Sequence, residues 1–392
     1  MPSRKQIRES KKYFWLVLVI LNIALVMMVD IVAGVTYKKF NGYSWYYVWK
    51  YGVKSDRAHN STYRIKSYRY HHDFVKNVNS KDNARWGGEV YSVITNSLGF
   101  RDGINRQVPL QSEKKRLVFL GDSFTEGIGL DYEKTFVGLI GNALKKKYNV
   151  LNAGVTSYSP IIYWKKVEYL INTARLEFDE LIVYLDISDI QDEASIYKLN
   201  TNWFVRAFRG QIGDRDKKPL QSEFRKENTI LWAWLRDLTK KEKISVSKES
   251  IFNEKKVFTY RDSIDIHRGS WTFNSKAYKE YGERGLNLSS KNMGNLLQLL
   301  RQHKIKLTVA IYPWPGQIYY DTIDSKQVLF WENWTSKNNV RFINHFNDFY
   351  SLKDQIGAKQ LIENYYIPGD VHFNEKGNLL IKESFLNQYP HN

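Results

Sequence analysis

From residue 114 onward, short apolar segments alternate with longer amphipathic ones, and this alternation restricts the fold more than any other feature of the chain. Strands that alternate with helices form parallel sheets, because each connection has to cross a face of the sheet. We therefore predict an α/β fold with a parallel sheet between two layers of helices. The predicted strands are 114–121, 149–154, 180–188, 306–313 and 340–346, and the predicted helices are 133–148, 160–178, 288–305, 328–337 and 375–389.

The side chains best suited to chemistry directly follow the first predicted strand, in the run Gly121-Asp122-Ser123-Phe124-Thr125-Glu126-Gly127. Ligand sites of parallel α/β sheets lie at the carboxyl ends of the strands, where this serine falls. A serine hydroxyl is a weak nucleophile at neutral pH and needs a general base. Ser123 is therefore a candidate nucleophile, and a buried serine that only satisfies a turn is the alternative.

A candidate base lies near the other end of the chain, in the loop before the last predicted helix. There, His372 follows Asp370 by two residues. The imidazole of His372 would take the Ser123 proton, while the carboxylate of Asp370 would orient the ring and stabilise its charged form. The alternatives are a structural loop histidine and an aspartate that caps the next helix.

Four segments resemble, in order, the conserved blocks of the SGNH (GDSL-type) hydrolases. They are the Ser123 run, Asn152-Ala153-Gly154, Asp186-Ile187-Ser188-Asp189 and the Asp370/His372 loop. The segment Asn96-Ser97-Leu98-Gly99-Phe100-Arg101 is similar to one that precedes the serine block in membrane-anchored members. The resemblance implies a flavodoxin-like three-layer sandwich (the SGNH hydrolase fold), ester hydrolysis or acyl transfer, and neither metal nor cofactor. It also implies an oxyanion hole formed by the N–H groups of Ser123 and Gly154 and the side chain of Ser188.

The chain departs from the family pattern at two positions. Ser188 stands where the family has an asparagine amide, and its shorter, freely rotating hydroxyl is a poorer oxyanion donor; Asn152 is a neighbour able to compensate. Many family hydrolases place the aspartate three residues before the histidine, where this chain has Gly369. The two-residue spacing resembles that of periplasmic O-acetyltransferases that modify polysaccharides. Asp189 is interpreted as a structural hydrogen-bonding residue.

An apolar run near the N-terminus predicts a membrane anchor. Residues 13–35 are interrupted only by Asn22 and Asp30, and about 34 Å of helix is enough to cross a membrane. The preceding residues 1–12 are basic, so the positive-inside rule keeps them cytoplasmic and places the rest outside the cytoplasm. A signal peptide cleaved near Val32-Ala33-Gly34 and a buried core helix are the alternatives.

Between the anchor and the predicted sheet, residues 36–112 form an aromatic and basic juxtamembrane extension without clear periodicity. Residues 113–392 are predicted to be the catalytic domain. About 195–285 is an insertion that is too long for a plain loop and should have structure of its own, such as a lid or a membrane-facing cap. Trp314, at the end of a predicted strand, would either stack on a sugar or pack in the core.

The amino-acid composition limits which kinds of site and which kinds of partner the chain can have. The chain has no cysteine, which excludes disulfides, a thiol nucleophile and cysteine-ligated metals. Its net charge of +18 favours anionic partners such as phospholipid headgroups or acidic polysaccharide, and no nucleic-acid-binding module is recognisable. The substrate is expected to be an acylated glycan or another ester, and the resemblance implies a membrane acyltransferase as a partner.

Three functions follow for a single-pass membrane protein whose catalytic domain faces the periplasm or cell surface. The first is an esterase or O-acyltransferase that uses Ser123, His372 and Asp370. The second is a catalytically weak or inactive SGNH-like adaptor in a polysaccharide-modifying complex, which the serine at position 188 favours. The third is a lipase acting on membrane lipid.

Overall fold

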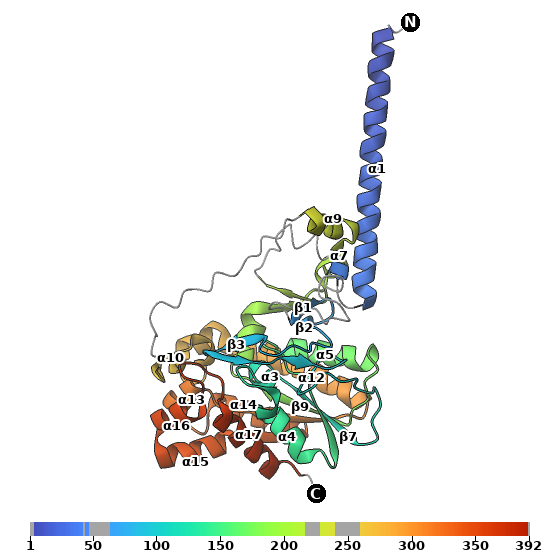
Figure 1. The fold of residues 1–392 in the computed structure, drawn as a ribbon. Coiled ribbons are helices and arrows are strands. Elements are labelled where there is room, and N and C mark those ends of the chain that lie inside the picture. Colours follow the sequence, from blue (N-terminus) through green and yellow to red (C-terminus); the bar gives the residue numbers. More distant parts are fainter. Residues whose placement is uncertain (1–3, 42–43, 47–62, 216–227, 240–258, 391–392) are drawn as a thin grey trace.

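The computed structural model describes residues 4–41, 44–46, 63–215, 228–239 and 259–390. A long helix, α1 (Arg4–Asn41), projects from a body that contains the strands and most of the helices after residue 63 (Figure 1). At the end of α1 that is nearest the body, two short helices, α7 (Trp203–Arg209) and α9 (Leu231–Thr239), lie beside it.

The body is built on a seven-stranded sheet of order β13-β12-β9-β7-β8-β6-β5. The five strands predicted from the sequence pair in parallel. Numbered along the chain, they have the order 2-1-3-4-5 of flavodoxin-like sheets. The predicted α/β fold with a flavodoxin-like parallel sheet is therefore confirmed. These strands are β7 (Lys115–Leu120), β8 (Tyr148–Asn152), β9 (Glu180–Leu185), β12 (Lys306–Ile311) and β13 (Arg341–Asn344).

Helices cover both faces of the sheet, as the alternation of segments predicts. The helices α5 and α12 pack on each other on one face, and α4 and α17 pack on each other on the opposite face (Figure 1). Among the described helices that follow β12, three were not predicted, namely α13 (Pro315–Tyr320), α15 (Phe346–Ile356) and α16 (Ala358–Tyr365). The predicted helices are α4 (Phe136–Leu144), α5 (Pro160–Asn172), α12 (Glu283–Gln302), α14 (Lys326–Lys337) and α17 (Glu375–Gln388).

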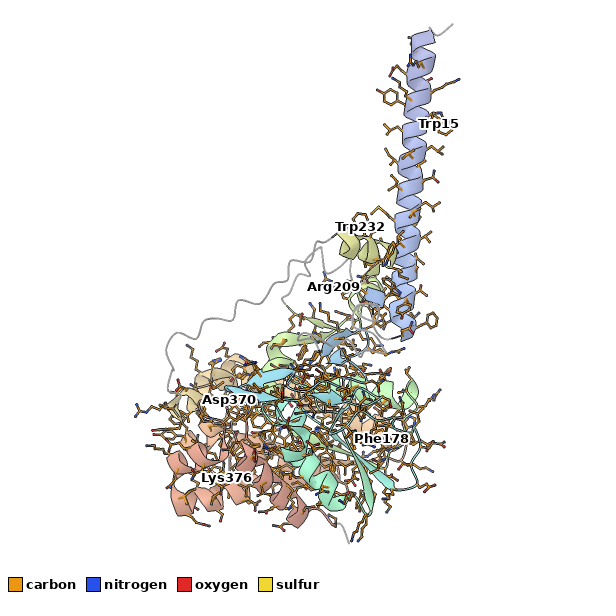
Figure 2. All side chains as sticks on the ribbon, viewed as in Figure 1. Trp15, Phe178, Arg209, Trp232, Asp370 and Lys376 are labelled. Carbon is orange, nitrogen blue, oxygen red and sulfur yellow. The ribbon has the colours of Figure 1, made fainter. Side chains whose placement is uncertain are left out.

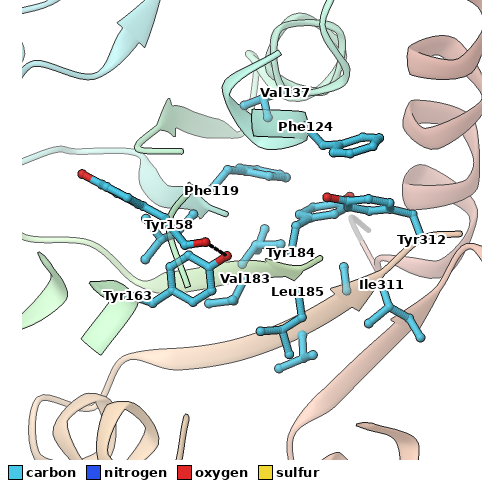
Figure 3. Close-up of a cluster of buried hydrophobic side chains, with 14 of the residues drawn as sticks. Phe119, Phe124, Val137, Tyr158, Tyr163, Val183, Tyr184, Leu185, Ile311 and Tyr312 are labelled. Atoms are coloured by element: carbon cyan, nitrogen blue, oxygen red, sulfur yellow. Dashed lines mark hydrogen bonds between the residues drawn. The ribbon is translucent and has the colours of Figure 1, made fainter. Parts of the chain in front are cut away.

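The core lies on both faces of the central strands. Every residue of β9 is buried, and so are the last five residues of β7, because helices cover these strands on both faces. Strands covered in this way have nearly continuous apolar sequences. Figure 3 shows aromatic rings gathered in this core, among them Phe119 of β7, Tyr184 of β9 and Tyr312 directly after β12. Phe124, the residue after the candidate nucleophile, belongs to the same cluster, so the site is held by a rigid core.

The extension contains strands that its sequence did not predict. Two hairpins form, β1 (Arg64–Ser67) with β2 (His71–Phe74) and β3 (Ala84–Trp86) with β4 (Glu89–Tyr91). Two short strands, β5 (Ile94–Thr95) and β6 (Arg101–Asp102), add antiparallel pairs to the edge of the central sheet. The predicted boundary after residue 112 therefore does not separate the extension from the sheet.

The insertion has structure of its own in the part that the structure describes. Strands β10 (Tyr197–Leu199) and β11 (Ile212–Asp214) form a hairpin with α7 between them, and α9 follows. Toward its end come α10 (Arg261–Ile264) and α11 (Ser275–Ala277). Among the described residues, one helix is long and apolar enough to cross a membrane, over Arg8–Asn41.

Candidate active site

Ser123 is the first residue of the short helix α3 (Ser123–Glu126), directly beyond the carboxyl end of β7. Gly121 allows this sharp turn, because a Cβ there would lie 2.2 Å from Thr125 Oγ1 and 3.0 Å from the carbonyl oxygen of Tyr184. Asp122 caps the helix by accepting a hydrogen bond from the Phe124 N–H at 3.0 Å. The serine therefore lies at the edge of the sheet where the sequence placed it.

His372 lies in the loop between α16 and α17, and this loop is fixed by its own backbone. Asp370 N–H donates to the carbonyl of Ile367 at 3.0 Å, and the turn between them has Pro368 at its second position and Gly369, with φ +71°, at its third. This is the pattern of a type II turn. Ile367 N–H in turn donates to the carbonyl of His372 at 2.8 Å, which ties the two ends of the loop together.

The fold brings Ser123 and His372 together although they are 249 residues apart in the sequence. His372 Nε2 lies 2.8 Å from Ser123 Oγ, and the other ring nitrogen, Nδ1, is hydrogen-bonded to Asp370 Oδ1. The same carboxylate oxygen accepts the His372 backbone N–H at 2.9 Å. Because Gly369 is needed in the turn, the two-residue spacing places the carboxylate where it can hold both the backbone and the ring of the histidine.

Aromatic rings hold the imidazole on two sides. The Phe124 ring packs on it at a centroid distance of 4.7 Å, and Trp86 contacts it edge to face at 5.5 Å. Trp86 Nε1 also donates to Asp370 Oδ2 at 3.1 Å. Burial acts to raise the pKa of Asp370, but the hydrogen bond and charge of His372, with a smaller part from Trp86, outweigh it and lower that pKa. The carboxylate is therefore ionised over the whole neutral range.

The site is nearly closed, but its Trp86 side is exposed to solvent. Ser123 and His372 keep 8% and 7% of their surface exposed, whereas Trp86 keeps 38%. Trp86 ends β3, and Gly87-Gly88 connect it to β4 as a two-residue loop in which both residues have positive φ. A Cβ at Gly87 would lie 2.6 Å from Ile367 Cγ2, so this hairpin packs closely on the loop that carries the histidine.

The three predicted oxyanion donors differ in their contacts. Ser123 N–H lies at the start of α3, beside its own hydroxyl. Gly154 N–H donates to Asn152 Oδ1 at 3.0 Å, and Asn152 Nδ2 donates to the carbonyl of Thr125 at 2.7 Å. Ser188 is buried, and its hydroxyl makes no hydrogen bond to any residue that the structure describes. Asn152 thus links β8 to α3 through its side-chain amide, and the Gly154 N–H is used to hold that side chain.

Three buried aspartates lie behind the serine, a group that sequence reasoning did not assemble. Asp122, Asp186 and Asp189 have carboxylate oxygens within 4.8 Å of one another, and they form the group of described residues able to offer several ligands to a metal ion. Five of their six carboxylate oxygens accept hydrogen bonds from protein donors, and Asp189 Oδ1 accepts none from the described residues. Tyr312 OH donates to Asp186 at 2.9 Å, and Tyr163 OH donates to Asp189 at 2.8 Å.

Burial and mutual repulsion raise the pKa values of two carboxyl groups in this aspartate cluster. Burial, followed by the charge of Asp186, raises the pKa of Asp122. Burial, followed by the charges of Asp122 and Asp186, raises the pKa of Asp189. Burial also raises the pKa of the nearby Asp192 to about 7, against the opposing charge of Arg268. Asp189 accepts hydrogen bonds from the hydroxyl of Tyr163 and the backbone N–H of Asp186, which are the contacts of a structural hydrogen-bonding residue.

Trp314 lies in the same region, and its contacts are those of a packing residue. It is buried, its Nε1 donates to Asp186 Oδ2 at 2.6 Å, and its ring stacks with Phe124 at 6.0 Å. The face that a sugar would need is therefore occupied by the protein core.

Sequence reasoning missed the contribution of the extension to the site. Besides Trp86, Arg64 forms an ion pair with the fully buried Glu126 at the end of α3. Arg101 is buried and donates to the carbonyls of Glu126, Gly127 and Leu130. The segment 96–101, which precedes the serine block, therefore supports the backbone at the end of α3. The Gly87-Gly88 pair is a hairpin signal that could have revealed β3 and β4.

Comparisons with known proteins give matches among solved structures. No protein-family model and no curated protein matches the chain. A lipolytic protein of the G-D-S-L family from Veillonella parvula is similar at 13% identity and a TM-score of 0.39, covering 70% of this chain and 98% of its own. The esterase EstA from Pseudoalteromonas is 12% identical, with a TM-score of 0.36 and coverage of 70% and 96%. Axe2, an acetylxylan esterase from Geobacillus stearothermophilus, is 10% identical, with a TM-score of 0.38 and coverage of 71% and 96%.

Proposed function

We propose that this chain is a serine-dependent esterase or O-acyltransferase with Ser123 as nucleophile, His372 as base and Asp370 as the residue that orients the base. The observation that carries the proposal is the hydrogen-bonded series from Ser123 Oγ to His372 Nε2 and from His372 Nδ1 to Asp370. This arrangement matches the roles that define a catalytic triad, in which geometry matters and sequence order does not.

In the proposed reaction, Ser123 Oγ attacks the carbonyl carbon of an ester while His372 Nε2 takes the hydroxyl proton. The tetrahedral intermediate collapses, and the leaving alcohol takes that proton from His372. The resulting acyl-serine is attacked by water or by an acceptor hydroxyl, whose proton passes to His372 and back to Ser123. Water gives hydrolysis, and a sugar hydroxyl gives acyl transfer. We propose an acylated glycan or related ester as the substrate and a membrane acyltransferase as a partner.

We propose that Trp86 is a positioning residue for this reaction. It contacts the base through its ring and donates to the carboxylate of Asp370, while keeping one side exposed. It therefore restricts the imidazole to the orientation in which Nε2 faces Ser123. The extension, and not only the catalytic domain, then supplies part of the site.

The test of the proposal uses a fluorophosphonate probe and p-nitrophenyl acetate with the full-length protein in detergent. Covalent labelling and ester hydrolysis that are both lost in Ser123→Ala would support the enzyme. A folded protein that neither labels nor hydrolyses would support the adaptor function instead, which the occupied Gly154 N–H and the serine at position 188 favour. A preference for p-nitrophenyl palmitate over the acetate would point to a lipase.

A further inference from the structure

The membrane-facing part of the molecule is joined to the insertion by one stripe of α1. Asp30, Gly34 and Lys38 are four residues apart in sequence, so they lie on the same face of the helix. Asp30 accepts three backbone N–H groups at the start of α9, from Ile230 and Leu231 to Oδ1 at 2.9 and 2.7 Å and from Trp232 to Oδ2 at 2.9 Å. The one carboxylate in the apolar run is thus the cap of a second helix.

The other two residues of the stripe make equally close contacts. A Cβ at Gly34 would lie 2.4 Å from the carbonyl oxygen of Asn228, so the two backbones can approach only at a glycine. Lys38 is buried, and its ammonium group donates to Asn228 Oδ1 at 2.6 Å and to the carbonyl of Phe208 at 2.9 Å. The helix α1 is therefore an integral part of the fold, as a cleaved signal peptide would not be.

These contacts determine the depth of α7 and α9 if α1 crosses a membrane. Counted from residue 13, about 20 residues of helix cross a hydrocarbon core of about 30 Å, which brings the outer boundary near residue 33. Because the start of α9 is bound to Asp30 and the end of α7 is bound to Lys38, both helices would be held at the outer boundary of that membrane.

The exposed side chains of α7 and α9 suit that depth. Trp203 and Phe204 of α7 are 71% and 63% exposed, and Arg206 and Arg209 on the same helix are exposed as well. On α9 the exposed apolar residues are Leu231, Trp232, Trp234 and Leu235. Figure 2 shows Trp232 and Arg209 beside the lower part of α1. Tryptophan at the headgroup level with arginine nearby is typical of helices that lie in a membrane interface.

We propose that α7 and α9 lie in the headgroup region of the membrane that α1 crosses and bind anionic phospholipid there. The occupant is lipid because these helices are continuous with the apolar surface of α1 and because the basic residues of α7 and the net charge of +18 are complementary to anionic headgroups. Three elements then hold the catalytic body at a fixed height and orientation above the membrane.

The absence of cysteine allows a direct test, because a single introduced cysteine can be labelled without background. Trp203→Cys on α7 and Trp234→Cys on α9 are labelled with an environment-sensitive fluorophore, and Lys376→Cys on α17 is the control. The full-length protein is reconstituted in vesicles of phosphatidylglycerol and phosphatidylcholine that contain a headgroup nitroxide lipid. We expect severalfold stronger quenching at positions 203 and 234 than at 376, and weaker quenching at position 203 in pure phosphatidylcholine.

Two outcomes would overturn the proposal. If quenching at positions 203 and 234 is as weak as at position 376, the helices do not contact lipid. If the cysteines at positions 203 and 234 are shielded from labelling only in native membranes, the helices contact a protein partner instead. A mature protein that begins after residue 34 would exclude the contacts with α1. A second variant leaves the labelled positions unchanged and removes the cap of α9. Asp30→Ala should reduce quenching at position 234. Asp30→Asn should retain most of the quenching, because an amide oxygen can still accept two of the three N–H groups.

Discussion

The substitution Trp86→Phe isolates one interaction of the proposed site. It keeps an aromatic ring against His372 and removes the indole N–H that donates to Asp370 Oδ2 at 3.1 Å. A hydrogen bond to a charged group contributes about 1.5–3 kcal/mol. Because Trp86 is 38% exposed, a water molecule can replace part of the lost hydrogen-bond energy in the variant. We therefore expect the substitution to raise the activation barrier by about 1–1.4 kcal/mol. At 1.36 kcal/mol per factor of ten, kcat should fall about 5–10-fold.

The assay is steady-state hydrolysis of p-nitrophenyl acetate, with kcat and KM determined separately. Since the lost hydrogen bond orients the base and does not contact the ester, kcat should fall while KM stays unchanged. Trp86→Ala, which also removes the ring, should lose more activity than Trp86→Phe, and Trp203→Phe on α7 is the matched control. An unchanged kcat in Trp86→Phe, or a raised KM with an unchanged kcat, would refute the positioning role and make Trp86 a packing or substrate-binding residue.

Other residues give equally direct tests. Asp370→Asn should lower kcat by about 10⁴-fold, measured with the same ester, because the imidazole loses its orienting carboxylate. Burial and the neighbouring aspartates raise the pKa of Asp189, so its cost to stability appears as pH rises above the ordinary aspartate range. Asp189→Asn should then match the wild type in Tm near pH 4 and exceed it by about 2–4 °C at pH 8, for roughly 1 kcal/mol; a lower Tm at pH 8 would contradict the assigned cause. Gly87→Ala, at φ +58° and against Ile367, should reduce kcat severalfold, whereas Gly88→Ala, at φ +86° with open space around it, should reduce it less. Residues 113–392 alone should fail to react with the fluorophosphonate probe, whereas residues 63–392 should react.

The sequence predicted the sheet because its parallel strands are buried on both faces and therefore read as uninterrupted apolar runs. The β9 segment Glu180–Leu185 is the clearest case, with every residue buried. The strands of the extension have only two to four residues and carry charged residues such as Arg64 and Arg85, so no period of two is visible in them. Their pairing is determined by tertiary contacts, among them the ion pair between Arg64 and Glu126.

The sequence pointed to the residues of the proposed triad but not to the residues that support them, for a physical reason. Ser123, His372 and Asp370 each stand in a local context, a strand end or a loop before a helix, that the sequence displays. The role of Trp86 depends on a contact across 284 residues, and the role of Asp30 depends on one across about 200 residues. The sequence identified Asp30 only as a polar break in an apolar run, since nothing near it indicates the helix that it caps.

The extension that follows α1 supports the proposed site through two separate contacts. Arg64 pairs with Glu126, whose burial would raise its pKa but whose pKa is lowered by the charge and hydrogen bonds of Arg64 and Thr156. This ionised pair lies under the helix that begins with Ser123, while Trp86 holds the opposing Asp370. Because a buried carboxylate without its cation is strongly destabilising, the position of α3 depends on the extension being in place. In the proposed enzyme, the segment that follows α1 would therefore align both the nucleophile and the base.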